Sequence, residues 1–149
     1  MTPEQKNEEF GRKFWERFFY FRQIEAEETV GKGVFAYSNE AFALLRDIEL
    51  CYASKAYYAC IILAQSIMEA HLKQVEGMRG GAAQLFKDAG IQAETEWLRN
   101  LRNAIVHGSP HEQVTYTVFP EDEQTLEEYC IRAFRLMHEL PIRMEKLRK

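Results

Sequence analysis

The chain has 149 residues, of which 46% are hydrophobic and 28% are charged, and its formal net charge is −4. This length and apolar content suit a single folded domain, residues 1–149, and exclude an intrinsically disordered chain. The acidic balance argues against a protein that binds nucleic acid through bulk positive charge, although it does not exclude a local basic site.

The sequence contains no recognisable targeting or membrane segment. Residues 1–9 are polar and charged, unlike a signal peptide. The longest apolar run, residues 56–64, is far shorter than the roughly 20 residues that span a membrane. Cys51, Cys60 and Cys130 are odd in number and widely spaced, which favours reduced, buried thiols over a disulfide or zinc framework. We therefore expect a cytoplasmic protein.

Two helices are predicted in the first third of the chain. Over residues 4–28, aromatic side chains recur at helical spacing, at Phe10, Phe14, Phe18 and Phe21. This stripe is typical of a core or a dimer interface rather than of a platform for stacked bases. Thr2 and Pro3 suit the N-cap and first turn of this helix, and Ser38 suits the N-cap of a second helix that runs to about Cys51.

The next helix, from about Lys55 to Glu76, is predicted to lie at the centre of a bundle. Its first half is apolar on all sides, over residues 56–64, and such a helix must be covered on every side. The stretch from Cys51 to Ser54 is interpreted as a tight turn, although no glycine or proline marks it. Glycines beginning at Gly77 end the central helix.

The second half of the chain is also predicted to be helical. A short helix over residues 82–89 precedes one from Glu94 to His107, after which Gly108 suits the C′ position. Residues 113–119 are β-prone and suit an extended arm or a small hairpin. A last long helix starts near Pro120, and Pro141 is expected to kink or interrupt it. Together these elements predict an all-α, up-and-down bundle of four or five helices.

The helix that ends at His107 carries the residues best suited to chemistry. Its apolar face consists of Trp97, Leu98, Leu101, Ala104 and Ile105, and the opposite side is polar. Asn103 and His107 are neighbours at i and i+4 on that side. Arg102 and His107 are five residues apart, so they project about 140° apart on a straight helix. Either the Arg102 side chain swings round, or a second copy completes the site.

These residue types suit the cleavage of a phosphodiester bond. An arginine such as Arg102 binds phosphate in a bidentate fork and stabilises the charge that develops on it. His107 can move a proton near neutral pH. Asn103 can orient either group. Arg99, on the same helix, is a candidate for binding the substrate.

The segment from Arg102 to His107 resembles R-N-x-x-x-H, the signature of HEPN domains (higher eukaryotes and prokaryotes nucleotide-binding). The upstream run Glu69-Ala70-His71-Leu72-Lys73 is similar to the end of that family's central helix. The resemblance spans roughly residues 38–140. One toxin branch of the family carries a modified tyrosine two residues after the histidine, and this chain has Ser109 there, so we do not assign it to that branch.

The resemblance implies a helical bundle that dimerises and pairs two motifs in one cleft. It implies a metal-independent endoribonuclease without a cofactor, in which His107 activates the 2′-hydroxyl, Arg102 binds the scissile phosphate and Asn103 orients them. The products would be a 2′,3′-cyclic phosphate and a 5′-hydroxyl. Many members are toxins or defence effectors, so the expected partners are RNA, a second copy, and a cognate antitoxin or partner protein.

Other interpretations of the same residues remain open at this stage. The chain could be a non-catalytic HEPN-like module that binds a nucleotide or a protein. His107 could serve only as a helix cap, because a histidine in the last turn suits the helix dipole. Arg102 could serve only in an ion pair, and Asn103 in a hydrogen bond to another helix. The spacing alone is common, since Arg132 and His138 also satisfy its looser form.

Overall fold

The computed structural model describes residues 1–32, 37–108 and 120–149, and within the last range the side chains from Glu123 onward. Its six helices are α1 (Pro3–Thr29), α2 (Asn39–Ala53), α3 (Tyr57–Gln74), α4 (Ala82–Asp88), α5 (Gln92–His107) and α6 (Pro120–Arg148). The described ranges contain helices and no strands, which confirms the all-α prediction. The described ranges hold six helices, one more than the upper count predicted for the bundle, and the predicted short helix over residues 82–89 is among them as α4. The arm or hairpin expected near 113–119 lies outside the described residues.

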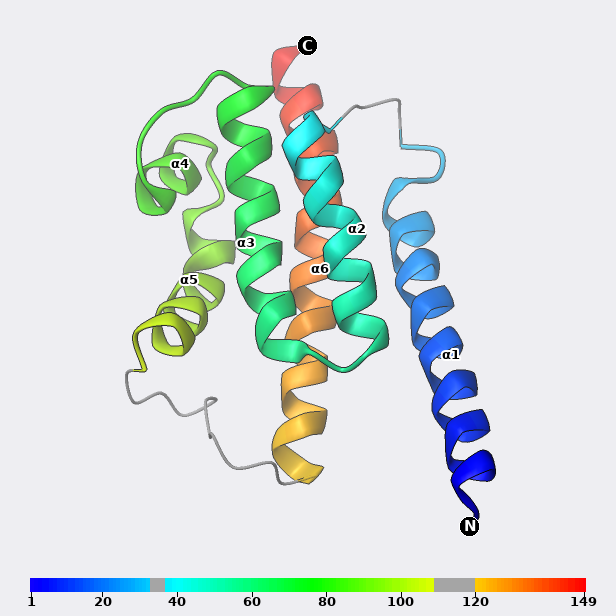
Figure 1. Ribbon diagram of the computed structural model, residues 1–149. Helices are drawn as coiled ribbons and strands as arrows, with labels where there is room; N and C mark the ends of the chain where they lie inside the picture. The colour runs from blue at the N-terminus through cyan, green and yellow to red at the C-terminus, as the bar shows by residue number, and fades with distance from the viewer. Residues whose placement is uncertain (33–36, 109–119) are drawn as a thin grey trace.

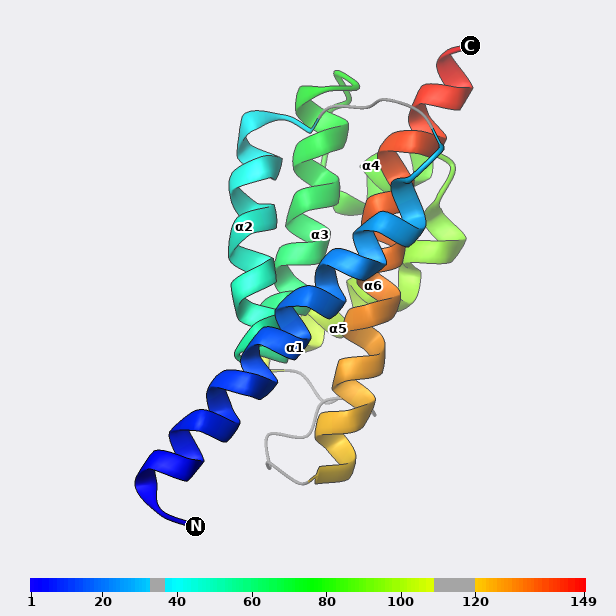
Figure 2. The same cartoon turned by 90° about the vertical axis from the view of Figure 1, so that its right-hand side faces the viewer.

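The helices are arranged around α3. Figure 1 shows α3 and α6 in the middle of the bundle, α2 beside them, α4 and α5 on one side and α1 on the other. Figure 2 shows that the N-terminal half of α1 runs past the ends of α2 and α3 and away from them. None of the helices in the described ranges is both long and apolar enough to cross a membrane.

Side-chain caps start the first two helices where the sequence predicts them. The Thr2 hydroxyl accepts a hydrogen bond from the Gln5 N–H at 3.2 Å, and the Gln5 side chain accepts one from the Thr2 N–H at 2.8 Å. The Ser38 hydroxyl accepts from the Ala41 N–H at 3.1 Å. Each cap satisfies a backbone donor that the helix itself leaves unpaired.

The turn between α2 and α3 forms without a glycine. Lys55 adopts a left-handed conformation with φ of 65°, and the Ala56 N–H donates to the Cys51 carbonyl at 2.8 Å. The turn lies later than expected, because α2 continues to Ala53. The Arg17 Nε of α1 donates to the Ala53 carbonyl at 2.9 Å, so α1 satisfies the end of α2.

The core is built on α3, as its apolar character predicts. Ten of its 18 residues are buried, including Cys60, Ile61 and Met68. Cys60 and Cys130 are buried and Cys51 is half-buried, and all three are unpaired thiols, as expected. The helix α6 continues through Pro141 without interruption. The side chains on both sides of this proline are buried, so packing offsets the backbone hydrogen bond that proline cannot make.

A histidine is enclosed in this core. His138 of α6 is fully buried, its ring lies 5.7 Å from that of Phe21, and its Nδ1 lies 3.2 Å from the Tyr37 hydroxyl. Burial lowers the pKa of His138 to about 4. The imidazole is therefore neutral in the folded protein at neutral pH.

This burial predicts a loss of stability in mild acid. Below the ordinary histidine pKa of about 6.5, the unfolded chain binds a proton at His138 that the folded chain does not bind, so the free energy of unfolding falls as the pH drops. Between pH 7 and 5 this residue alone should remove about 2 kcal/mol. The matched variant His138→Gln keeps a partner for Tyr37 and does not titrate. Urea denaturation of both proteins should show the extra loss in the wild type only, and parallel pH profiles would contradict the prediction.

Candidate functional site

The helix α5 lies at the edge of the bundle, on the side opposite α1 (Figure 1). Leu98, Leu101 and Ala104 are buried, and Trp97 and Ile105 are half-buried against the core, which confirms the predicted apolar face. The Glu94 carboxylate pairs with Arg143 of α6 at 3.1 Å. These contacts hold α5 in place and leave its other face to solvent.

A glycine ends α5 directly after the motif. Gly108 has φ of 63°, a left-handed conformation, and its N–H donates to the Ala104 carbonyl. Glycine adopts this conformation without the strain that a Cβ adds, so the predicted C′ glycine is confirmed. His107 is the last helical residue and its side chain is exposed. The imidazole is therefore accessible at a fixed helix end.

Three of the four candidate residues form a row along α5. Arg99, Asn103 and His107 are spaced four residues apart, so each lies about one turn beyond the previous one. Arg102 joins the row through its side chain, because its guanidinium donates to the Asn103 Oδ1 at 3.2 Å. Arg99, Arg102 and Asn103 are half-buried. We call these four residues the α5 polar row.

The structure does not bring Arg102 and His107 together within one copy. Among the described residues, no hydrogen bond joins their side chains, and Arg102 instead contacts the neighbouring Asn103. Their separation of about 140° around the helix explains this. Asn103 is the link, because it contacts Arg102 directly and precedes His107 by one turn.

The charge around the row suits an anion. From Trp97 to His107 the sequence contains two arginines, one histidine and no carboxylate. Of the two glutamates earlier in α5, Glu94 is paired with Arg143. The other, Glu96, is exposed three residues before Arg99 and seven before Asn103, so it lies on the same side of α5 as the row. Only the part of the row from Arg99 to His107 is free of helix carboxylates.

A third arginine lies against α5 from the side. The Arg132 guanidinium of α6 lies 4.2 Å from the centroid of the Trp97 ring, and the Trp97 ring lies 5.6 Å from that of Tyr129. This contact could not be predicted from the sequence, because Trp97 and Arg132 are far apart along the chain. Arg132 and His138, which also satisfy the looser arginine–histidine spacing, do not form a site on the surface. Arg132 is exposed, whereas His138 is fully buried.

The polar residues at the end of α3 have structural surroundings. His71 is buried, its Nε2 lies 3.3 Å from the Glu76 carboxylate, and burial lowers its pKa despite that carboxylate. Glu69 accepts a hydrogen bond from Gln65 at 2.8 Å. These partners of His71 and Glu69 therefore lie on α3 or directly after it, and not on α5.

Comparison with models of protein families, with curated proteins and with solved structures found no match to this chain. No family is therefore shown for this chain, and the resemblance of residues 102–107 to the HEPN signature stays a prediction.

The exposure of His107 predicts that it contributes little to stability. His107→Ala should change the free energy of unfolding by less than about 0.5 kcal/mol. Leu101→Ala, one and a half turns earlier on the buried face of the same helix, should cost about 2–5 kcal/mol because it leaves a cavity. Urea denaturation measures both. A loss on His107→Ala as large as that on Leu101→Ala would show that the histidine is structural.

Proposed function

We propose that this protein is a metal-independent endoribonuclease of the HEPN type that acts as a toxin or defence effector. The observation that supports this best is the α5 polar row, in which Arg102, Asn103 and His107 lie in the last two turns of α5, where the helix has no carboxylate after Glu96. These groups are those that cleavage by an RNA 2′-hydroxyl needs.

Each residue has a role in the proposed reaction. His107 takes the proton from the 2′-hydroxyl, whose oxygen attacks the adjacent phosphorus. The bond from phosphorus to the 5′-oxygen breaks, that oxygen takes a proton from solvent water and leaves as a hydroxyl, and His107 returns its proton to solvent. Arg102 stabilises the charge on the phosphoryl oxygens. Asn103 positions Arg102 through their hydrogen bond, and Arg99 binds the RNA backbone.

The proposed site is completed by a second copy. The side chains of Arg102 and His107 diverge around one helix, so a single phosphate cannot meet both closely without a large movement of the arginine. Two α5 helices facing each other would supply Arg102 from one copy and His107 from the other. Such a cleft would bind RNA through a few local charges, and its affinity should fall with salt.

One observation favours a second candidate function. His107 is exposed at the helix end, and Arg102 is bonded to Asn103 rather than directed to the histidine. This arrangement in a single copy suits a non-catalytic module that binds a nucleotide or the backbone of RNA. The first candidate cleaves RNA, whereas the second binds its ligand without cleaving it.

The test is RNA cleavage by the purified protein in EDTA. His107→Ala should lower the rate by about 10²- to 10⁴-fold, as expected for the loss of a proton-transfer group. Arg102→Ala should lower it by about 10²- to 10³-fold, because a donor to the developing charge is lost. Gln92→Ala, an exposed change at the other end of α5, should have no effect.

Substrate and product chemistry separate the alternatives. A 2′-deoxy substitution at the cleaved position should abolish cleavage, and the product should end in a 2′,3′-cyclic phosphate. Equal cleavage by the wild type and both variants would reveal a contaminant and refute the proposal. Binding without turnover, weakened by Arg102→Ala, would support the binding module. Growth arrest on expression, relieved by His107→Ala, would support the toxin role.

A further inference from the structure

The outward side of α1 carries aromatic residues where a surface helix usually has charges. Trp15 is 53% exposed and Phe19 is 64% exposed. Both lie on the side of α1 opposite Phe21 and Ile24, which are buried in the core. The rings of Trp15 and Phe19 lie 6.0 Å apart. Core packing within this chain therefore does not explain them.

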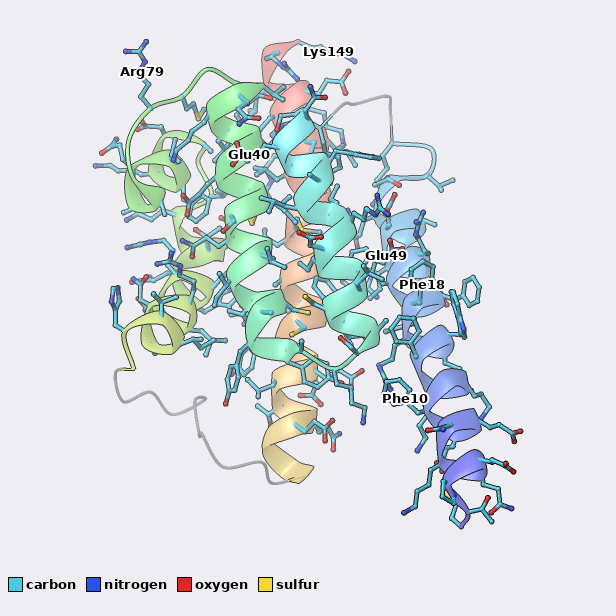
Figure 3. The ribbon with its side chains drawn as sticks, in the orientation of Figure 1. Phe10, Phe18, Glu40, Glu49, Arg79 and Lys149 are labelled. Carbon is cyan, nitrogen blue, oxygen red and sulfur yellow. The ribbon has the colours of Figure 1, made fainter. Side chains whose placement is uncertain are left out.

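The apolar surface continues onto α2. Phe42 is 69% exposed and Leu50 is 47% exposed, and with Phe18 they line a groove between α1 and α2. Figure 3 shows Glu49 of α2 beside Phe18 of α1 at this groove. We call Trp15, Phe18, Phe19, Phe42 and Leu50 the α1–α2 aromatic face.

A glycine lies within the continuous helix α1 on the same side. Gly11 lies one turn before Trp15, and a Cβ added to it would meet no atom within 4 Å. A glycine inside an exposed helix destabilises it relative to alanine. The fold gives no reason for this glycine, since space for a side chain is available. A second backbone or ring that approaches closely at this point would supply one.

Opposite charges flank Trp15 at equal distances. Glu8 lies seven residues before Trp15, and Arg22 lies seven residues after it. Seven residues are about two turns, so all three share one side of α1. Arg22 also pairs with Glu49, and its guanidinium lies 5.5 Å from the centroid of the Phe18 ring. Opposite charges therefore stand at equal distances on either side of Trp15. A second α1 helix lying antiparallel would place a glutamate opposite each arginine.

We propose that the α1–α2 aromatic face binds a second copy of this chain, with the two α1 helices antiparallel and centred on Trp15. In this register Glu8 of each copy faces Arg22 of its partner, and Phe19 packs over the partner's Gly11. The pairing is isologous, as a two-fold dimer requires.

The exposed area is of the size that such a contact needs. With an aromatic side chain counted at roughly 200 Å², the exposed parts of Trp15, Phe19 and Phe42 supply about 400 Å² per copy, half of the roughly 800 Å² that each partner buries in a standard interface. The surrounding polar side chains of α1 and α2 can supply the remainder. The contact is separate from the α5 polar row, because α1 and α5 lie on opposite sides of the bundle (Figures 1 and 2).

Sedimentation equilibrium of the full chain tests the proposal, with no RNA present. Trp15→Glu should raise the dimer dissociation constant by about 30-fold or more, as for a central aromatic anchor. The matched control is Leu147→Glu, which places the same charge at a leucine that is 69% exposed on α6, and it should not change the dissociation constant. A monomeric wild type, an unchanged dissociation constant in Trp15→Glu, or an equal loss of association in both variants would overturn the proposal. An unchanged constant would leave only the α5 contact of the proposed function.

A charge exchange tests the register. Glu8→Arg and Arg22→Glu should each lose association through α1, because that contact between two identical copies would oppose like charges twice. An equimolar mixture should dimerise, since both cross-pairs are then complementary. Circular dichroism checks that Arg22→Glu, which also loses its partner Glu49, stays helical, and Glu8→Arg is independent of that pair. A mixture that associates no more tightly than either variant alone would refute the antiparallel register, whether or not the copies also pair through α5.

Discussion

The burial of α3 is the constraint on which the rest of the fold depends. The first half of this helix is apolar around its whole circumference, so no single neighbour can remove it from water. The helices α2 and α6 cover it along its length, and α4 and α5 close the side that they leave open. The position of α5 follows from this requirement. Its Leu98–Leu101–Ala104 face must seal α3, and its opposite face is thereby directed to solvent.

The candidate site is consequently a surface feature fixed by core packing. The polar row belongs to the same sixteen-residue helix that buries Leu98 and Leu101, so its backbone cannot shift without exposing apolar area. Gly108 also defines the position of His107, because its left-handed conformation ends the helix directly after that residue. A rigid element that presents a few polar groups at its end is a suitable support for binding or catalysis.

Local chemistry explains which parts of the fold could be predicted from the sequence. The caps at Thr2 and Ser38 and the glycine at Gly108 act over a few residues, and the apolar face of α5 repeats with the helical period, so each is readable along the chain. The turn at Lys55 could not be foreseen, because a lysine in a left-handed conformation carries no sequence mark. Its placement is decided by how α2 and α3 pack.

Contacts between segments far apart in the sequence were harder to predict than these local features. The enclosure of His138 and the position of Arg132 over Trp97 depend on how α6 lies against α1, α3 and α5. The bond from Arg102 to Asn103 depends on a rotamer, which periodicity does not encode. The sequence did locate the polar residues of α5. It could not show whether the side chains of Arg102 and His107 meet within one copy. In the structure they do not meet, and for this reason the proposed cleft needs two copies.

The placement of α1 and α5 on opposite sides of the bundle has a consequence for assembly topology. A chain with two separate self-complementary faces has two different two-fold axes. If both axes operate, copies join alternately through one face and then the other. The series closes into a tetramer with dihedral symmetry when the axes are perpendicular and intersect, and otherwise it can extend as a filament. The angle between α1 and α5, set by the covering of α3, would then determine whether the assembly is finite.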